Sequence, residues 1–312
     1  MQPKIAVLDD YQGLALKMAD WSKVSARAQV EVFNDHLADA EAVAQRLYPF
    51  DIVCVMRERT PLGAALIERL PNLKLIASTG PRNASIDLKA AAARGIEVVH
   101  TGYFGSPTVE LTWALILASA RHIVAEAAAI RSGGWQHSIG DDLSGKTLGV
   151  IGLGNLGSKV AKIGLAFGMQ VIAWSQNLTA EKAVAVGAAL VSKEELLRRS
   201  DIVSLHLVLS ERSRGLIGAE ELSLMKPTAR LVNTSRGPIV VESALIAALQ
   251  AGQIAGAAID VYDAEPLPPN HPYRHIDNLL ATPHIGYVSR GLYERFYRDT
   301  VSNILAWLDA RH

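Results

Sequence analysis

The chain has 312 residues, more than one hydrophobic core usually supports, so we expect two domains. Its 31 Lys and Arg residues balance its 31 Asp and Glu residues, which argues against nucleic acid or an anionic membrane surface as the main partner and favours a small molecule. Apolar stretches such as 111–120 are too short to span a membrane, and no signal-peptide pattern precedes the first expected strand. The only cysteine, Cys54, cannot form a disulfide within the chain, which is typical of a protein of the reducing cytoplasm.

The first hundred residues alternate short β-branched runs with Ala-rich and Leu-rich stretches, which is the pattern of parallel α/β units. Helices are expected at 37–47 and 86–94, with Pro71 and Gly95 among the residues that mark helix ends. Strands are expected at 4–10, 30–35, 51–56, 73–79 and 96–101. This order predicts a small flavodoxin-like sheet in a domain that covers residues 1–103.

A second α/β series follows a long helical pattern at 109–130, which Ser106-Pro107-Thr108 introduces. Strands are expected at 147–153, 169–175, 201–207, 229–235, 255–261 and 278–284. Such a series with crossover connections predicts a doubly wound Rossmann domain at 104–284. If the last expected helix, at 289–309, packs on the first domain, that domain is discontinuous and comprises 1–103 plus 285–312. The predicted fold class is α/β, with two doubly wound parallel-sheet domains, the second inserted into the first.

A glycine-rich turn, GLGNLG, lies between the strand at 147–151 and a helical run that starts at Gly157. Gly152 permits a tight turn, Gly154 lets the backbone approach a pyrophosphate, and Gly157 lets helix and strand pack closely. The helix N-terminus would face the anion. A turn without a ligand is the alternative, but the setting between strand and helix favours a dinucleotide site.

The strand after this turn ends in Trp174-Ser175-Gln176-Asn177, and the first acidic residue beyond it is Glu181. A carboxylate at this strand end usually holds the ribose hydroxyls of NAD, so its absence favours NADP over NAD. No arginine lies within 174–180 to bind the 2′-phosphate of NADP. Ser175 and Gln176 bonded to the ribose of NAD therefore stay an alternative, and the expected cofactor is NAD or NADP.

Three charged residues follow expected strands of the second domain: Arg236, Glu265 and His284. Strand carboxyl ends of a parallel sheet open onto the crevice where ligands bind, so the three side chains can converge there. Taken singly, each is better explained without a function: Arg236 as a surface arginine after a strand, Glu265 as an exposed loop acid, and His284 as a strand-end histidine bonded to backbone. Together, in this order, they point to a catalytic site.

Five ordered blocks of the sequence resemble the D-isomer-specific 2-hydroxyacid dehydrogenase family: GLGNLG at 152–157, VSLHLVL at 203–209, LVNTSRGPIV at 231–240, AAIDVYDAEPL at 257–267 and TPHIG at 282–286. The resemblance covers nearly the whole chain. It implies that the product of 2-oxo acid reduction is a D-2-hydroxy acid and that the protein is a homodimer. It also implies that Asn155 and Leu156 approach the pyrophosphate through their backbone. His206 ends a strand of the cofactor domain, and its neighbours are expected to wall the adenosine pocket; plain packing of His206 is the alternative. Thr234 and Asp260 are expected near the nicotinamide.

The chemistry of 2-oxo acid reduction assigns the three charged residues. Arg236 suits the substrate carboxylate, because a guanidinium pairs with it bidentately and stays charged. His284 suits the role of the acid that protonates the developing alkoxide, and of the base in the reverse direction. Glu265 would orient the imidazole of His284 and stabilise its charged form.

Two loops of the first domain depart from the family pattern or add charge to it. Gly80 is kept where the family usually has the first of two glycines that frame the substrate, but Arg82 stands where the second is expected. Another loop, after the strand at 51–56, carries Arg57 and Arg59. We hypothesise that one or more of these arginines meets a second anionic or polar group of the substrate. The alternative is that they are solvated or paired.

The leading functional prediction is a 2-oxo acid reductase of the hydroxypyruvate or glyoxylate kind. A 3-phosphoglycerate dehydrogenase-like enzyme is one alternative, although the chain ends at His312 without the regulatory domain that many such enzymes append. A non-enzymatic scaffold that binds NAD(H), resembling corepressors of this fold, is another. No metal is expected, since His271 and His275 have the spacing of a zinc pair but Pro272 argues against a helix there.

Overall fold

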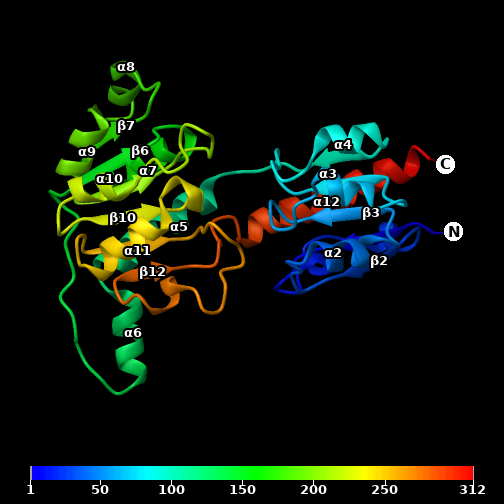
Figure 1. The fold of residues 1–312 in the computed structure, drawn as a ribbon, viewed down its shortest axis with the longest axis horizontal. Coiled ribbons are helices and arrows are strands. Elements are labelled where there is room, and N and C mark those ends of the chain that lie inside the picture. The colour runs from blue at the N-terminus through cyan, green and yellow to red at the C-terminus, as the bar shows by residue number, and fades with distance from the viewer. Residues whose placement is uncertain (1, 312) are drawn as a thin grey trace. The chain divides into compact units, whose positions relative to one another are not determined.

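The computed structural model describes residues 2–311, which divide into two compact units (Figure 1). Unit 1 comprises the chain up to Phe104 together with the residues from Ser289 on, and unit 2 comprises Gly105–Val288. The chain therefore passes from one unit to the other twice. Each unit has its own sheet and its own hydrophobic core.

Unit 1 contains a five-stranded parallel sheet in the order β2-β1-β3-β4-β5, the flavodoxin-like order. Its strands are β1 (Lys4–Val7), β2 (Gln29–Val32), β3 (Ile52–Val55), β4 (Leu75–Ser78) and β5 (Glu97–His100). Its helices are η1 (Ala15–Lys17), α1 (Ser22–Ser25), α2 (Ala40–Leu47), α3 (Ala64–Glu68), α4 (Leu88–Ala93) and α12 (Arg290–Asp309). Every residue of β3 and β4 is buried, as expected for central strands that are covered on both faces.

Unit 2 contains a seven-stranded parallel sheet in the order β12-β11-β10-β9-β6-β7-β8, in which the first strand of the unit lies next to the fourth. This is the Rossmann order with one strand added at the edge. Its strands are β6 (Thr147–Ile151), β7 (Gln170–Trp174), β8 (Ala189–Leu190), β9 (Ile202–Leu205), β10 (Arg230–Asn233), β11 (Gly256–Ile259) and β12 (Leu279–Ala281). Its helices are α5 (Ser106–Ala120), α6 (Ile123–Arg131), α7 (Asn155–Ala166), α8 (Ala180–Val184), α9 (Lys193–Arg199), α10 (Ala219–Leu224), η2 (Gly237–Ile239), α11 (Glu242–Gln250) and η3 (Pro272–His275).

The predicted fold class of two parallel-sheet α/β domains is confirmed, and every strand expected from the sequence is present. The short strand β8 was not predicted. The single helix expected at 109–130 is wrong: α5 ends at Ala120 and α6 starts at Ile123. Between them His122 has a left-handed backbone with φ of 51°, which interrupts the helix.

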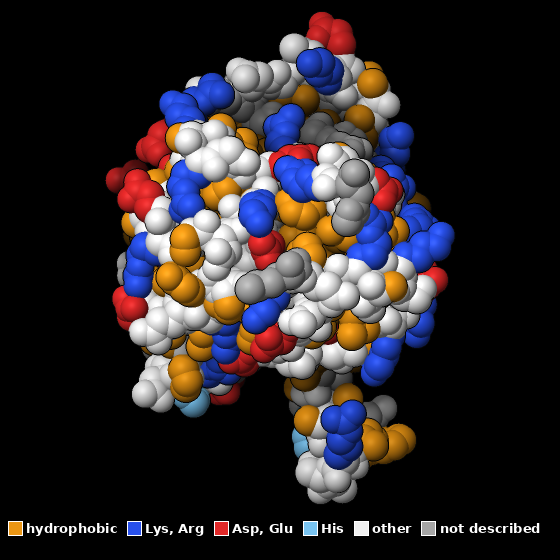
Figure 2. Space-filling view, turned by 90° about the vertical axis from the view of Figure 1, so that its right-hand side faces the viewer, with side chains coloured by type: hydrophobic (Ala, Val, Ile, Leu, Met, Phe, Trp, Pro, Cys, Tyr) orange, Lys and Arg blue, Asp and Glu red, His pale blue; other side chains and the backbone are white. Residues whose placement is uncertain are grey.

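No single helix in residues 2–311 is long and apolar enough to cross a membrane; α5 and α6 reach that length and apolarity only as a pair, bent by 64° at their break. On the face drawn in Figure 2, Lys and Arg side chains are interspersed with Asp and Glu side chains.

Candidate active site

The glycine turn joins the central strand β6 to α7. It is tightly packed at two of its glycines and open at the third. Gly152 has φ of 101°, and a Cβ at this position would lie 2.5 Å from the carbonyl oxygen of His206. A Cβ on Gly157 would lie 2.0 Å from the carbonyl oxygen of Gly152, so helix and turn touch there. A Cβ on Gly154 would meet no atom within 4 Å. The turn is therefore closed toward the protein and open at Gly154, directly before the N–H groups that start α7.

The segment after β7 lies beside this turn in the sheet. The N–H of Gly152 donates to the carbonyl oxygen of Trp174, 2.9 Å away, which ties the turn to the end of β7. Beyond it, Ser175 is half-buried, and Gln176 and Asn177 are exposed. No acidic residue lies between Trp174 and Ala180, so this strand end offers hydroxyl and amide groups but no carboxylate.

His206 follows β9 and contacts the glycine turn through its backbone. Its N–H donates to the carbonyl oxygen of Ile151 at 2.7 Å, and its Nε2 lies 2.9 Å from the hydroxyl of Ser204. Burial lowers the pKa of His206 to about 4, so the imidazole is neutral at physiological pH. A neutral imidazole beside the turn is better suited to line a nucleotide pocket than to bind a phosphate through its charge.

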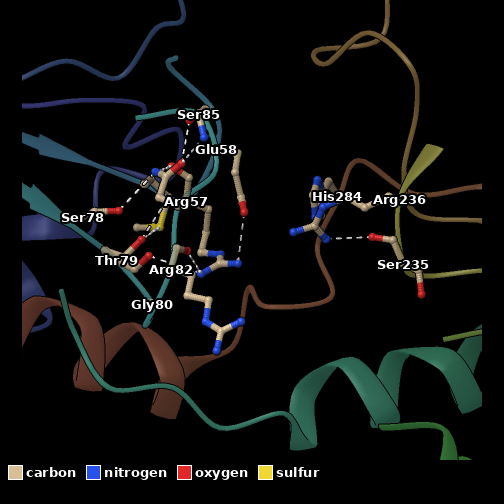
Figure 3. A network of polar contacts seen from close by, with 12 residues as sticks. Arg57, Glu58, Ser78, Thr79, Gly80, Arg82, Ser85, Ser235, Arg236 and His284 are labelled. Carbon is tan, nitrogen blue, oxygen red and sulfur yellow. Dashed lines mark hydrogen bonds and ion pairs between the residues drawn. The ribbon is translucent and has the colours of Figure 1, made fainter. Parts of the chain in front are cut away.

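Arg236 follows β10 in a turn that Asn233 braces. The Nδ2 of Asn233 donates to the carbonyl oxygen of Arg236 at 2.9 Å, and its Oδ1 accepts the N–H of Ser235 at 3.0 Å. The guanidinium of Arg236 donates through Nη1 to the carbonyl oxygen of Ser235 at 2.8 Å (Figure 3). Thr234 is buried, with its hydroxyl 2.8 Å from that of Thr112 on α5. Sequence reasoning missed Asn233 and Thr112; an Asn inside an apolar strand was the available signal for the first.

His284 follows β12 and is held by Glu265 from the loop after β11. The Nδ1 of His284 and Oε2 of Glu265 are 2.5 Å apart. The second carboxylate oxygen of Glu265 accepts the N–H of Tyr262 at 3.0 Å, so the carboxylate is itself fixed. Because Nδ1 is engaged, Nε2 is the ring nitrogen that His284 presents to another molecule.

Asp260, at the end of β11, organises the backbone on both sides of His284. Its carboxylate accepts the hydroxyl of Thr282 at 2.6 Å and the N–H groups of Ile285 and Gly286 at 2.8 Å each. Burial raises the pKa of the Asp260 carboxyl, while these three hydrogen bonds oppose that shift. His284 itself has a left-handed backbone with φ of 52°. Asp260 thus has a bracing role that the sequence did not reveal.

The register of the sheet brings these strand ends to one edge. Asn233 on β10 pairs with Ile259 on β11, and Ile259 pairs with Ala281 on β12. Asn233, Ile259 and Ala281 therefore form one row across the three strands. Arg236 follows Asn233 by three residues, and His284 follows Ala281 by three residues. Where these strands end, β10 and β12 are two strand spacings apart, at about 4.8 Å each.

The remaining predicted residues lie elsewhere. Arg57, Gly80 and Arg82 belong to unit 1, at the carboxyl ends of β3 and β4. The two ring nitrogens of His271 contact the carboxylate of Glu242 at 3.0 Å and the N–H of Tyr273 at 3.2 Å. Among residues 2–311, no group of three or more His, Cys, Asp or Glu side chains is arranged to hold a metal ion.

Comparison with known proteins gives a consistent result. The family model for the D-isomer specific 2-hydroxyacid dehydrogenase, NAD binding domain, matches residues 113–286. A glyoxylate reductase of Aeropyrum pernix is 42% identical over 256 residues, 79% of this chain and 76% of that protein. A hydroxypyruvate reductase of Thermotoga maritima is 38% identical over 267 residues, 83% of this chain and 85% of that protein. The crystal structure of a phosphoglycerate oxidoreductase from Vibrio cholerae o395 matches with a TM-score of 0.94 and 36% identity, covering 99% of this chain and 100% of that chain.

Proposed function

The chain belongs to the D-isomer specific 2-hydroxyacid dehydrogenase family, and from that premise we propose how its residues reduce a 2-oxo acid to a D-2-hydroxy acid. It is an oxidoreductase that acts on CH–OH groups, and its second unit is an NAD-binding domain. The cofactor is therefore NAD(H) or NADP(H). The assignment of individual residues that follows is our proposal.

The glycine turn fits the pyrophosphate of such a cofactor. Its open side at Gly154 leaves space where a side chain would stand, and the first N–H groups of α7 follow directly. Gly152, Gly154, Asn155, Leu156 and Gly157 would hold the pyrophosphate. Ser175, Gln176 and His206 would lie toward the adenosine, and Thr234 and Asp260 toward the nicotinamide. Bound NAD(P)H supplies the hydride.

The other tasks fall to three side chains at the edge of the sheet of unit 2. Arg236 pairs with the substrate carboxylate through two parallel N–H groups. His284 donates the proton on Nε2 to the carbonyl oxygen as it becomes an alkoxide, and takes it back in the reverse reaction. Glu265 holds Nδ1 and balances the charge of the imidazolium. The short contact between Glu265 and His284 is the observation that carries this proposal.

We favour NADP as the cofactor because the strand end at Ser175 and Gln176 lacks the carboxylate that would repel a 2′-phosphate. Hydroxyl and amide groups there can also bind the ribose of NAD, so the two cofactors have to be compared directly. Hydroxypyruvate and glyoxylate are the preferred substrates of this proposal, since relatives carry those names. A phosphoglycerate dehydrogenase-like activity is the second candidate, favoured by the structural match to a phosphoglycerate oxidoreductase.

A crossed screen tests this function. Glyoxylate, hydroxypyruvate, pyruvate, oxaloacetate and 3-phosphohydroxypyruvate are each offered with NADH and with NADPH, and cofactor oxidation is followed at 340 nm. We expect turnover of at least one 2-oxo acid, with a higher kcat/KM for NADPH than for NADH. Cofactor binding without turnover of any 2-oxo acid would instead support a scaffold. Turnover that is fastest with 3-phosphohydroxypyruvate would support the second candidate.

We also propose that the enzyme is a homodimer, as the resemblance of the sequence to this family implies. The helix α6 and the segment that follows it are compatible with this proposal. They expose several large apolar side chains in unit 2, namely Ile123, Val124, Ile130, Trp135 and Ile139. Apolar surface of this kind favours burial in an interface.

A further inference from the structure

Tyr262 lies in unit 2, three residues beyond the end of β11, in the segment that leads to Glu265. The residue is buried, with 7% of its surface exposed. Its ring belongs to an apolar core cluster and packs against the ring of Tyr273, with 6.3 Å between the ring centres. A phenylalanine would fill the same space, but a tyrosine brings a hydroxyl that needs a hydrogen-bond partner in such a core.

The hydroxyl of Tyr262 has its partner two residues before His284. It donates to the carbonyl oxygen of Thr282 at 2.8 Å, and the same oxygen accepts the N–H of His284 at 3.0 Å. Both bonds can form together, because a carbonyl oxygen has two lone pairs. Burial, with Asp260 and Glu265 nearby, raises the pKa of the Tyr262 phenol, so the hydroxyl stays protonated and remains a donor. One oxygen atom thus joins the side chain of Tyr262 to the backbone of His284.

The backbone of Tyr262 holds the partner of His284. Its N–H donates to Oε1 of Glu265 at 3.0 Å, while Oε2 of Glu265 lies 2.5 Å from Nδ1 of His284. The two ends of one residue therefore reach both members of the Glu265–His284 pair. Asp260 does not duplicate this arrangement, since its carboxylate binds the hydroxyl of Thr282 and leaves the carbonyl oxygen to Tyr262.

The position of Tyr262 is itself fixed by Gly237, the residue after Arg236. Gly237 is buried, and a Cβ there would lie 2.1 Å from the carbonyl carbon of Tyr262 and 2.2 Å from its oxygen. The turn that carries Arg236 therefore lies directly against the backbone of Tyr262. Tyr262 is thus the residue at which the segments that follow β10, β11 and β12 meet.

We propose that Tyr262 is a positioning residue for the reaction, whose hydroxyl and N–H hold His284 and Glu265 in the geometry from which Nε2 donates its proton. This inference rests on the proposed function, because it gives Tyr262 a part in the proton transfer of His284. Tyr262 acts through these two residues and not through contact with the substrate. A residue of this kind raises the rate by keeping the acid in place before the substrate arrives.

Tyr262→Phe tests the hydroxyl, because the ring stays in the core and one hydrogen bond is lost. We expect kcat to fall by about 3- to 10-fold, the usual contribution of one such bond. KM for the 2-oxo acid and Kd for NADPH should each change less than about twofold, since Arg236 and the glycine turn are unaltered. Tyr273→Phe is the matched control: it removes the hydroxyl of the neighbouring buried ring, keeps the bond to Thr282 and should leave kcat unchanged. An unchanged kcat in Tyr262→Phe, or an equal loss in both variants, would overturn the proposal.

A double-mutant cycle separates positioning from general destabilisation. Tyr262→Phe is combined with His284→Asn, and kcat is measured for each single variant and for the pair. If the hydroxyl acts through His284, its removal should change kcat less than about twofold once the imidazole is gone. The same loss in both backgrounds, or a loss that circular dichroism melting curves trace to partly unfolded protein, would show a merely structural role and contradict the proposal.

Nitrogen NMR signals of the His284 imidazole report its surroundings without turnover, and so separate this inference from the proposed function. They are identified as the imidazole signals that are missing in His284→Asn. Tyr262→Phe should shift or broaden them, and Tyr273→Phe should not. If the wild type reduces no 2-oxo acid but shows this selective change, the proposed function fails and the positioning of His284 by Tyr262 stands. If a 2-oxo acid is reduced and Tyr262→Phe alters neither these signals nor kcat, the inference alone fails.

Discussion

At the scale of single residues, the position of His284 is determined from two directions. Glu265 fixes the ring through Nδ1, and Asp260 fixes the backbone through the N–H groups of Ile285 and Gly286. The imidazole therefore has little freedom to turn when a substrate arrives. A general acid held in advance loses less entropy in the transition state, which is how positioning contributes to rate.

Replacing His284 with Asn tests its role without a new backbone strain, because Asn tolerates the left-handed conformation that His284 adopts. We expect kcat to fall by about 10²- to 10⁴-fold, the usual contribution of a positioned acid. The affinity for NADPH, measured by fluorescence titration, should change less than about twofold. Turnover that stays at the wild-type level would remove His284 from the mechanism.

The charged residues of the site could be predicted from the sequence because apolar runs in it indicate where the strands end. Arg236, Glu265 and His284 each follow an apolar run, and parallel strands place such residues at one edge. The partners Thr112 and Thr282 could not be predicted. Thr112 on α5 meets Thr234, and Thr282 meets Asp260, and nothing in the local pattern shows partners that are 122 and 22 residues away.

At the scale of elements, the glycines of the turn between β6 and α7 have two different roles. Gly157 is required for packing, since a Cβ there would lie 2.0 Å from the carbonyl oxygen of Gly152. Gly154 is surrounded by open space and has no packing role within residues 2–311. Sequence reasoning identified this turn because its glycines lie between a strand and a helix.

The two glycines can be distinguished by matched substitutions. Gly157→Ala should lower the free energy of unfolding by about 1–3 kcal/mol or more, the usual cost of forcing a methyl group into a packed site. Gly154→Ala should lower it by at most about 1 kcal/mol, since only its preference as a helix N-cap is lost. It should nevertheless weaken NADPH binding at least about tenfold. Urea denaturation and fluorescence titration measure the two effects, and unchanged cofactor affinity in Gly154→Ala would place the pyrophosphate elsewhere.

The break between α5 and α6 shows where element prediction failed. Residues 109–130 are rich in Ala, Leu and Ile, so local propensity favours one continuous helix. The chain instead adopts a left-handed backbone at His122, and α6 leaves the direction of α5 by 64°. Nothing in the Arg121-His122 pair marks this break, because neither residue is a strong helix breaker.

At the scale of the whole molecule, the sequence was sufficient for the class of each sheet. Alternating strands and helices require parallel sheets with crossover connections, and both strand orders follow known doubly wound arrangements. The exposure of apolar side chains on and after α6 was not predictable, since the sequence does not distinguish exposed apolar residues from buried ones. Trp135 and Ile139 are 73% and 94% exposed.

The homodimer proposal predicts that this surface becomes buried when two copies associate. Light scattering coupled to gel filtration should give about twice the mass of one chain, which is 33.5 kDa. Replacing Trp135 with Ser and Ile139 with Asp should shift the mass toward one chain while the melting curve of each chain stays cooperative. A single-chain mass for the wild type at micromolar concentration would contradict the proposal.

The place of α12 has a consequence for the order in which the molecule is assembled during synthesis. This helix packs against β4 and α1 of unit 1, yet it is made after all of unit 2. The continuous stretch Gly105–Val288 can complete its core while the sheet that begins the chain still lacks a covering helix. The unit translated first is therefore completed last, and its apolar helix-binding face stays exposed to solvent until the final 20-residue helix emerges from the ribosome.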